Sequence, residues 1–354
     1  MGNRRPIFQP NELSNDVAAS MRTRIIAGLT ALAIILPFVM FGDWPFFAMV
    51  SIVLGMAIVE IVRCAKTKYS KALYVVALIL AFLILFWNFF QDIPSMFKGD
   101  DSWSGIYDSY GRIYISITIM FVGICLLFLT ILVDKNFTIV DATFIFTTVV
   151  LIALGLQSFL FIRFYPVYVR HDEIREAIKL GQAITQPSRF NAYDNCESFL
   201  FVLYVALGAC LNDAFAYFVG VFFGKHKMNP RISPKKTWEG FFGGVILTSI
   251  TLSAFAFIMA YADNGNHAIL KGLLDADHWY HIIILSTLIP LVSVLGDLVF
   301  SSIKRHYEIK DFSRLIPGHG GILDRIDSII FAAITVAVYT SIACGVTPGG
   351  FILP

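Results

Sequence analysis

The feature that most constrains this chain is its series of long apolar segments, because a helix needs about 20 such residues to cross the hydrocarbon core of a membrane. Nine segments have roughly this length, at residues 24–41, 45–62, 72–90, 113–133, 138–162, 198–223, 241–261, 281–300 and 325–345. Hydrophobic residues make up 57% of the 354 residues and charged residues only 15%, which is too apolar for a water-soluble protein of this size. The sequence therefore predicts an all-α, polytopic integral membrane protein with about nine transmembrane helices.

Polar stretches divide the chain into four predicted parts. Residues 1–22 form a polar leader, 23–162 a five-helix membrane region, 163–197 a polar insert, and 198–354 a four-helix membrane domain with the candidate catalytic residues. The leader lacks a small-residue cleavage site, so the first apolar segment is predicted to be retained as a helix. Within the insert, the sequence HDEIREAIKL favours a short amphipathic helix.

Lysine and arginine collect in alternate loops, which predicts the orientation of the chain because short cytoplasmic loops are rich in these residues. The basic set comprises Arg22, Arg24, Arg63, Lys66, Lys68, Lys71, Lys225, Lys227, Arg231, Lys235, Lys236, Lys304, Arg305, Lys310, Arg314 and Arg325. The opposite loops are acidic or balanced. We therefore expect a cytoplasmic N-terminus, an external C-terminus and a non-cytoplasmic insert. The net charge of +2 is small and dispersed, which argues against a nucleic-acid partner.

A charged, glycine-rich run from Ser301 to Asp327 lies between the last two apolar segments. Asp297, Ser301 and Lys304 stand at i, i+4 and i+7, so a helix would present them on one face. Asp324 and Asp327 are spaced i, i+3 at the start of the last segment, where a helix dipole favours anions. Three carboxylates and a hydroxyl at a membrane boundary suit a hard cation such as Mg²⁺.

The sequence PGHGG within this run favours a turn that approaches phosphate closely. Gly318, Gly320 and Gly321 let backbone amides come near phosphate oxygens, and His319 is a candidate to cap the turn or donate to phosphate. A competing interpretation is juxtamembrane salt bridging, with aspartates that merely neutralise anchoring cations. Asp297 argues against it, because this carboxylate lies within the apolar run LVSVLGDLVF, where it costs a few kcal/mol.

A second group of polar residues is predicted on the same face of the membrane. Asp213 lies inside an apolar segment, and Lys235, Lys236 and Thr237 lie in a loop that contains Pro230 and Pro234. Two adjacent ammonium groups and a hydroxyl suit a phosphate or polyphosphate ligand. The alternative is attraction between the lysines and anionic lipids.

These residues resemble the signature of the phosphatidate cytidylyltransferases, also called CDP-diacylglycerol synthases. The matching positions are Ser301, Ile303, Lys304, Arg305, Lys310, Asp311, Ser313, Ile316, Pro317, His319, Gly320, Gly321, Asp324, Arg325 and Asp327. The segments DAFAY, which begins at Asp213, and SPKKTWEG are also similar to that family. The resemblance covers roughly residues 205–345, whereas the first five segments resemble the family only in hydropathy.

The resemblance implies a nucleotidyltransferase of phospholipid biosynthesis that converts CTP and phosphatidate into CDP-diacylglycerol and pyrophosphate. It implies catalytic roles for Lys304, Asp324 and Asp327, and a cation centre with Mg²⁺, and with room for a second cation such as K⁺, at Asp297, Ser301, Asp324 and Asp327. Substrate contacts are expected from Asp213, Lys235, Lys236, Thr237, Arg305, Lys310, His319, Gly320, Gly321 and Arg325.

Two alternatives remain open from the sequence. A CTP-dependent polyprenol kinase, of the dolichol type, would release CDP instead of pyrophosphate. A cation-coupled transporter would place carboxylates near the middle of the bilayer and show pseudo-repeated halves. The modest length favours a bacterial plasma membrane over an internal eukaryotic one, and a homodimer is left open.

Overall fold

The computed structural model describes residues 28, 30, 31, 33–65, 69–90, 121–132, 134, 137–179, 192–262, 268–270, 273–313, 315 and 320–344. Within these, the side chains of 43, 87–90, 165–179, 192–197 and 344 are not described. The predicted leader, residues 24–27, 29 and 32 of the first predicted span, and His319 lie outside the described residues.

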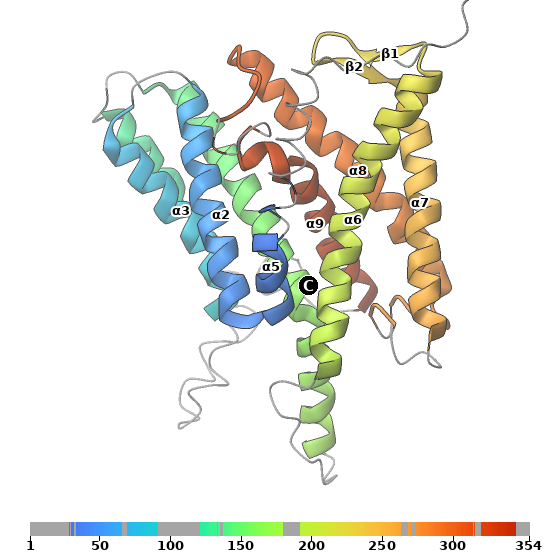
Figure 1. Cartoon of the computed structure of the whole chain (residues 1–354). Coiled ribbons are helices and arrows are strands. Elements are labelled where there is room, and N and C mark those ends of the chain that lie inside the picture. The colour runs from blue at the N-terminus through green and yellow to red at the C-terminus, as the bar shows by residue number, and fades with distance from the viewer. Residues whose placement is uncertain are drawn as a thin grey trace, which may run out of the picture.

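The described chain is a bundle of long apolar helices (Figure 1). The helices are α2 (Asp43–Cys64), α3 (Lys71–Phe90), α5 (Ile139–Lys179), α6 (Ala192–Phe223), α7 (Trp238–Tyr261), α8 (Trp279–His306) and α9 (Leu323–Cys344). Residues 33–41 and Phe121–Leu132 are also helical. Six described helices are long and apolar enough to cross a membrane, and Lys71–Phe86 and Phe121–Leu132 are shorter apolar helices. The prediction of an all-α, polytopic membrane protein is confirmed, apart from one small hairpin.

That hairpin replaces the loop that the sequence predicts after the sixth span. Strands β1 (Lys227–Asn229) and β2 (Ser233–Thr237) pair antiparallel and join α6 to α7. Its turn is fixed locally, because the Ile232 N–H donates to the Asn229 side-chain oxygen at 3.3 Å. The hairpin and the C-terminal ends of α2 and α8 lie at the same end of the bundle (Figure 1).

Two helices extend beyond the apolar segments that predict them. Helix α5 continues to Lys179, through the first half of the polar insert, and α6 begins at Ala192. Helix α8 continues to His306, because its last turn carries Lys304, Arg305 and His306, which complement the negative end of the helix dipole. The polar residues at the end of α8 are therefore held on a regular helix.

Close helix contacts join the two halves of the bundle. Helix α5 packs against α2, α3, α6 and α9, and α9 in turn packs against α8. At the α5–α9 contact, a Cβ on Gly155 would come within 2.4 Å of the Ile330 side chain. The absence of a side chain at Gly155 therefore permits close helix packing, as small residues do in membrane interfaces.

Candidate active site

The start of α9 crosses α8 at a glycine, and this crossing brings carboxylates together. A Cβ on Gly296 would lie 2.7 Å from the Asp327 carbonyl oxygen, so the two backbones are in contact. The carboxylates of Asp297 and Asp327 consequently interact through their charges. Asp327 is only 7% exposed, and the Ser328 N–H donates to its Oδ1 at 2.7 Å.

A lysine from the hairpin neutralises the α8 carboxylate. Lys236 of β2 forms an ion pair with Asp297 Oδ2, and Ser301 Oγ donates to Asp297 Oδ1 at 3.2 Å. The Lys236 and Asp297 side chains are 26% and 24% exposed, so this pair remains accessible from outside the protein. The i, i+4 spacing of Asp297 and Ser301 does place both on one helix face.

Asp213 of α6 adds a third carboxylate to this group. Its charge interacts with that of Asp297, and the cations Lys236 and Arg325 act on it with the opposite sign. The charges of Asp213 and Asp327 also repel each other. Asp213 is exposed even though it lies within an apolar span. We call Asp213, Asp297 and Asp327 the carboxylate cluster.

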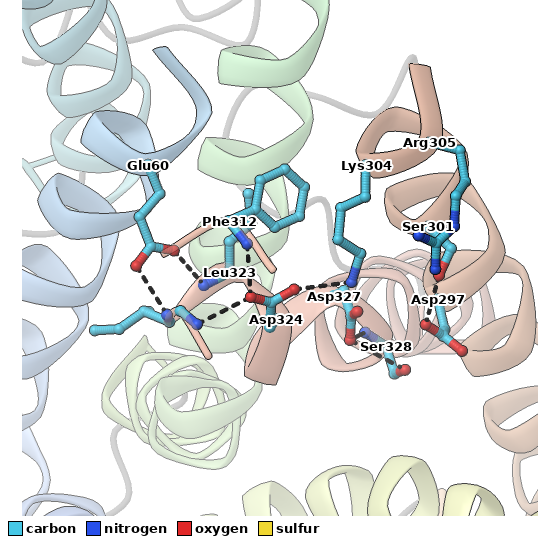
Figure 2. Close-up of polar contacts among 12 residues, drawn as sticks. Glu60, Asp297, Ser301, Lys304, Arg305, Phe312, Leu323, Asp324, Asp327 and Ser328 are labelled. Atoms are coloured by element: carbon cyan, nitrogen blue, oxygen red, sulfur yellow. Dashed lines mark hydrogen bonds and ion pairs between the residues drawn. The ribbon is translucent and has the colours of Figure 1, made fainter. Parts of the chain in front are cut away.

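The fourth predicted carboxylate has a separate set of partners (Figure 2). Asp324 Oδ1 accepts a hydrogen bond from Lys304 Nζ at 2.8 Å, and both side chains are largely buried, at 4% and 11% exposed. Its Oδ2 accepts from the N–H groups of Phe312 and Gly321, each at 2.9 Å. The Phe312 ring lies 5.4 Å from Lys304 Nζ, within cation–π range. Asp324 therefore uses both of its oxygens to organise the segment between α8 and α9.

The base of the hairpin positions Lys236 through polar contacts on both sides. Thr237 is buried and caps α7, because its Oγ1 accepts from the Gly240 N–H at 3.1 Å. The Glu239 carboxylate accepts from the N–H groups of Lys225 and His226, each at 3.1 Å. These contacts fix the strand that carries Lys236 against the end of α6.

The remaining predicted site residues lie around the carboxylate cluster and Asp324, and they differ in exposure and in hydrogen bonding. Arg305 Nε donates to the Ile232 carbonyl at 3.1 Å, which ties α8 to the turn of the hairpin. Lys235, Lys310 and Arg325 are exposed, whereas Gly321 is buried. Gly320 has a positive φ of 86°, a conformation that favours glycine. The structure thus groups Asp213, Lys236, Asp297, Ser301, Lys304, Asp324, Arg325 and Asp327, and leaves Lys235 and Lys310 at the periphery of this set.

Residues 22–343 match the cytidylyltransferase family. The chain belongs to this family. It is 29% identical over 311 residues to a phosphatidate cytidylyltransferase of Bacillus subtilis (strain 168), which covers 88% of this chain and 94% of that relative.

Two other relatives share a higher identity with this chain, over shorter stretches. A phosphatidate cytidylyltransferase of Haemophilus influenzae is 42% identical over 140 residues, or 40% of this chain and 45% of that protein. One of Staphylococcus aureus (strain COL) is 42% identical over 135 residues, or 38% of this chain and 46% of that protein. Because the family match spans both halves of the bundle, it includes the helices that surround the carboxylate cluster.

The donor set in this cytidylyltransferase suits a hard cation that binds few protein ligands. Among the residues that the structure describes, no three acidic, histidine or cysteine side chains converge closely enough to enclose a metal. Mg²⁺ commonly binds one or two carboxylates and completes its shell with water and substrate phosphates. Asp297 and Ser301 offer oxygen donors of this kind at a partly exposed position, and Asp327 offers a buried one, whereas Asp324 already accepts three hydrogen bonds.

Sequence reasoning missed one buried carboxylate, Glu60 of α2, which is 5% exposed. Its Oε1 accepts from Ser313 Oγ at 2.6 Å and from the Ile322 N–H at 3.0 Å, and its Oε2 accepts from the Leu323 N–H at 2.8 Å. Figure 2 shows Glu60 beyond Asp324, on the side away from Asp297. The available signal was a single glutamate within an apolar segment, which is costly unless it is paired.

Proposed function

We propose that this cytidylyltransferase converts CTP and phosphatidate into CDP-diacylglycerol and pyrophosphate. A phosphatidate oxygen forms a bond to the α-phosphorus of CTP, and the bond to the bridging β-phosphate oxygen breaks, so that pyrophosphate leaves with the electron pair. The observation that carries the proposal is the clustering of Asp213, Asp297 and Asp327 with cations in a member of this family.

The side chains of this site act by positioning and by neutralising charge. Both substrates are polyanions, so cations are needed to bring them together, and phosphoryl-type transfer requires little covalent help from the protein. Lys236 and Arg325 are placed to contact phosphate, and Lys304, held by Asp324, supports charge beside Asp327. The attacking phosphate is already ionised at neutral pH, so the reaction needs no general base.

The proposal includes Mg²⁺ held by Asp297, Ser301 and Asp327, with Asp324 joining only if its present hydrogen bonds rearrange. When bound, Mg²⁺ neutralises phosphate charge and stabilises the leaving pyrophosphate. A second cation such as K⁺ at the same carboxylates stays a prediction. Lys235, Thr237, Arg305, Lys310, His319, Gly320 and Gly321 stay predicted substrate contacts, with Thr237 and Arg305 now seen to support the hairpin.

We further propose that the site faces the cytoplasm of a bacterial plasma membrane, in a chain of about nine spans with the N-terminus inside. The hairpin and the C-terminal ends of α2 and α8 lie at one end of the bundle (Figure 1), and they border the basic loops that the charge rule assigns to the cytoplasm. Accessibility labelling of single cysteines placed at Lys225 and at Asp275 tests this orientation, while light scattering of the detergent complex determines whether the protein is a homodimer.

The deciding experiment follows the products of the full-length protein in detergent with phosphatidate, CTP labelled in the α-phosphate, and Mg²⁺. We expect labelled lipid and pyrophosphate in equal amounts, with complete loss in EDTA and recovery on adding Mg²⁺. Asp324→Asn should lower the rate by about 100-fold or more while the protein remains folded. CDP as the nucleotide product would establish the polyprenol kinase instead, and lipid-independent ion flux would establish the transporter.

A further inference from the structure

The carboxylate of Glu60 connects the N-terminal half of the bundle to the segment that enters α9. Glu60 belongs to α2, whereas its partners Ser313, Ile322 and Leu323 lie in and after the glycine-rich run. Two of the partners are backbone N–H groups at the start of α9, where the helix dipole favours a negative charge. Three short hydrogen bonds to one buried carboxylate form a strong local contact.

Two carboxylates each join the two ends of the same segment. Glu60 binds Ser313 on one side and Ile322 and Leu323 on the other. Asp324 Oδ2 binds the N–H groups of Phe312 and Gly321 in the same manner. We call this arrangement the double clasp. A carboxylate that only capped α9 would accept from the N–H groups of Ile322 and Leu323 and would not also bind Ser313.

Packing around the clasp leaves little room for other arrangements. A Cβ on Gly321 would lie 2.6 Å from Glu60 Oε2, so the carboxylate rests directly on the backbone. At Gly320, a Cβ would lie 2.9 Å from Asp324 Oδ2, and the φ of 86° also favours glycine there. The two glycines therefore let both carboxylates approach the chain from neighbouring positions.

We propose that Glu60 is a positioning residue for the CTP polyphosphate, an inference that depends on the proposed function. By closing the segment between Ser313 and Ile322, Glu60 fixes the start of α9. That start sets the direction in which Asp324 meets Lys304 and the position from which Asp327 interacts with the other two carboxylates of the cluster. The N-terminal half thus contributes to the active site through the Glu60 side chain, without touching substrate.

The test replaces Glu60 by glutamine, which keeps the volume but puts an NH₂ group where a carboxylate oxygen accepted hydrogen bonds. We expect faster hydrogen exchange at the amides of Ile322 and Leu323. We also expect a rise of about tenfold in the KM for CTP, with the KM for phosphatidate changed less than twofold, because a misplaced binding segment weakens its own ligand. The matched control is Asp134→Asn, since Asp134 also holds a remote backbone N–H, that of Ser70 at 2.7 Å.

Each result decides part of the proposal. Unchanged exchange at Ile322 and Leu323 would overturn the clasp, and faster exchange with an unchanged KM for CTP would overturn the positioning role. An equal rise in both KM values would indicate a general structural effect and also overturn it. If Glu60→Gln does not fold, Ser313→Ala removes one hydrogen bond, and an unchanged KM for CTP in place of a rise of about threefold contradicts the proposal. If the wild type forms no labelled lipid, the proposed function fails, yet the exchange comparison still tests the clasp.

Discussion

The two halves of this bundle use charged side chains differently. In the half formed by α2, α3 and α5, charged side chains meet neutral backbone groups: Arg163 donates to the Val39 carbonyl, Glu60 accepts from the start of α9, and Asp134 accepts from the Ser70 N–H. In the half formed by α6 to α9, the like charges of the carboxylate cluster repel one another. The first pattern stabilises the folded bundle, whereas the second destabilises it.

Repulsion between carboxylates near a membrane costs stability unless a ligand relieves it. Lys236 and Arg325 provide part of this relief within the protein, but both also lie where an outside anion could bind them. A cation and a polyphosphate together would satisfy all of these charges. The contrast between the halves therefore separates side chains that hold the bundle from side chains that we propose bind a ligand.

The strongest test of this contrast is Asp327→Asn in the carboxylate cluster. We expect a fall of about 10²–10³-fold in kcat/KM, because the substitution removes charge where the cation is proposed to bind. The thermal stability of the unliganded protein should stay equal or rise, since one repelling charge is gone. Product formation and thermal unfolding in detergent measure the two effects. Asp275→Asn is the control, because Asp275 accepts from the His278 N–H near the start of α8, at the opposite end of that helix. Retained activity with lost stability would reverse the assignment.

The opposite pattern is expected for Arg163→Met in the N-terminal half. Arg163 is 1% exposed, and its Nε donates to the Val39 carbonyl at 3.1 Å, beside Gly42, whose φ is 67°. Losing this donor leaves a buried carbonyl unsatisfied, so the free energy of unfolding should fall by about 2–3 kcal/mol. The KM values of the protein that remains folded should match the wild type. A selective change in the KM for CTP would show that charged side chains of the N-terminal half also act on substrate binding, which contradicts the contrast.

Much of the bundle could be predicted from hydropathy, because span length depends on bilayer thickness and composition alone. The polar face of α8 could also be predicted from the sequence, since Asp297 and Ser301 follow helical periodicity. The hairpin could not be predicted in the same way: β1 has only three residues and β2 five, and both depend on the Glu239 contacts at their base. The helix predicted at HDEIREAIKL is present, but as the continuation of α5 to Lys179, and no apolar pattern indicates that it is continuous with the preceding span.

The role of Glu60 and the bonding of Asp324 depend on tertiary contacts that no spacing rule contains. Glu60 meets Ser313 from another half of the chain, and only the folded bundle brings them together. Asp324 and Asp327 share one helix face by spacing, yet Asp324 binds Lys304 and the Phe312 N–H, whereas the charge of Asp327 interacts with the other carboxylates of the cluster. Periodicity identifies the acidic residues, but the backbone around them decides which are free to bind a ligand.

The contact between the halves offers the finest test of how far they are independent. In Gly155→Ala the new Cβ would meet Ile330 at 2.4 Å, so α9 must shift or the core must strain, at about 1–2 kcal/mol. Because Ile330 lies one turn beyond Asp327, we also expect kcat/KM to fall by about threefold. Gly55→Ala is the matched control, since its Cβ would find only Phe82 at 3.9 Å, an ordinary contact, and alanine favours the helix. In Gly155→Ala, both the thermal stability and the rate of product formation should therefore fall. In Gly55→Ala, neither should fall. Lost stability with full activity in Gly155→Ala would show that α9 does not transmit strain from the N-terminal half to the carboxylates.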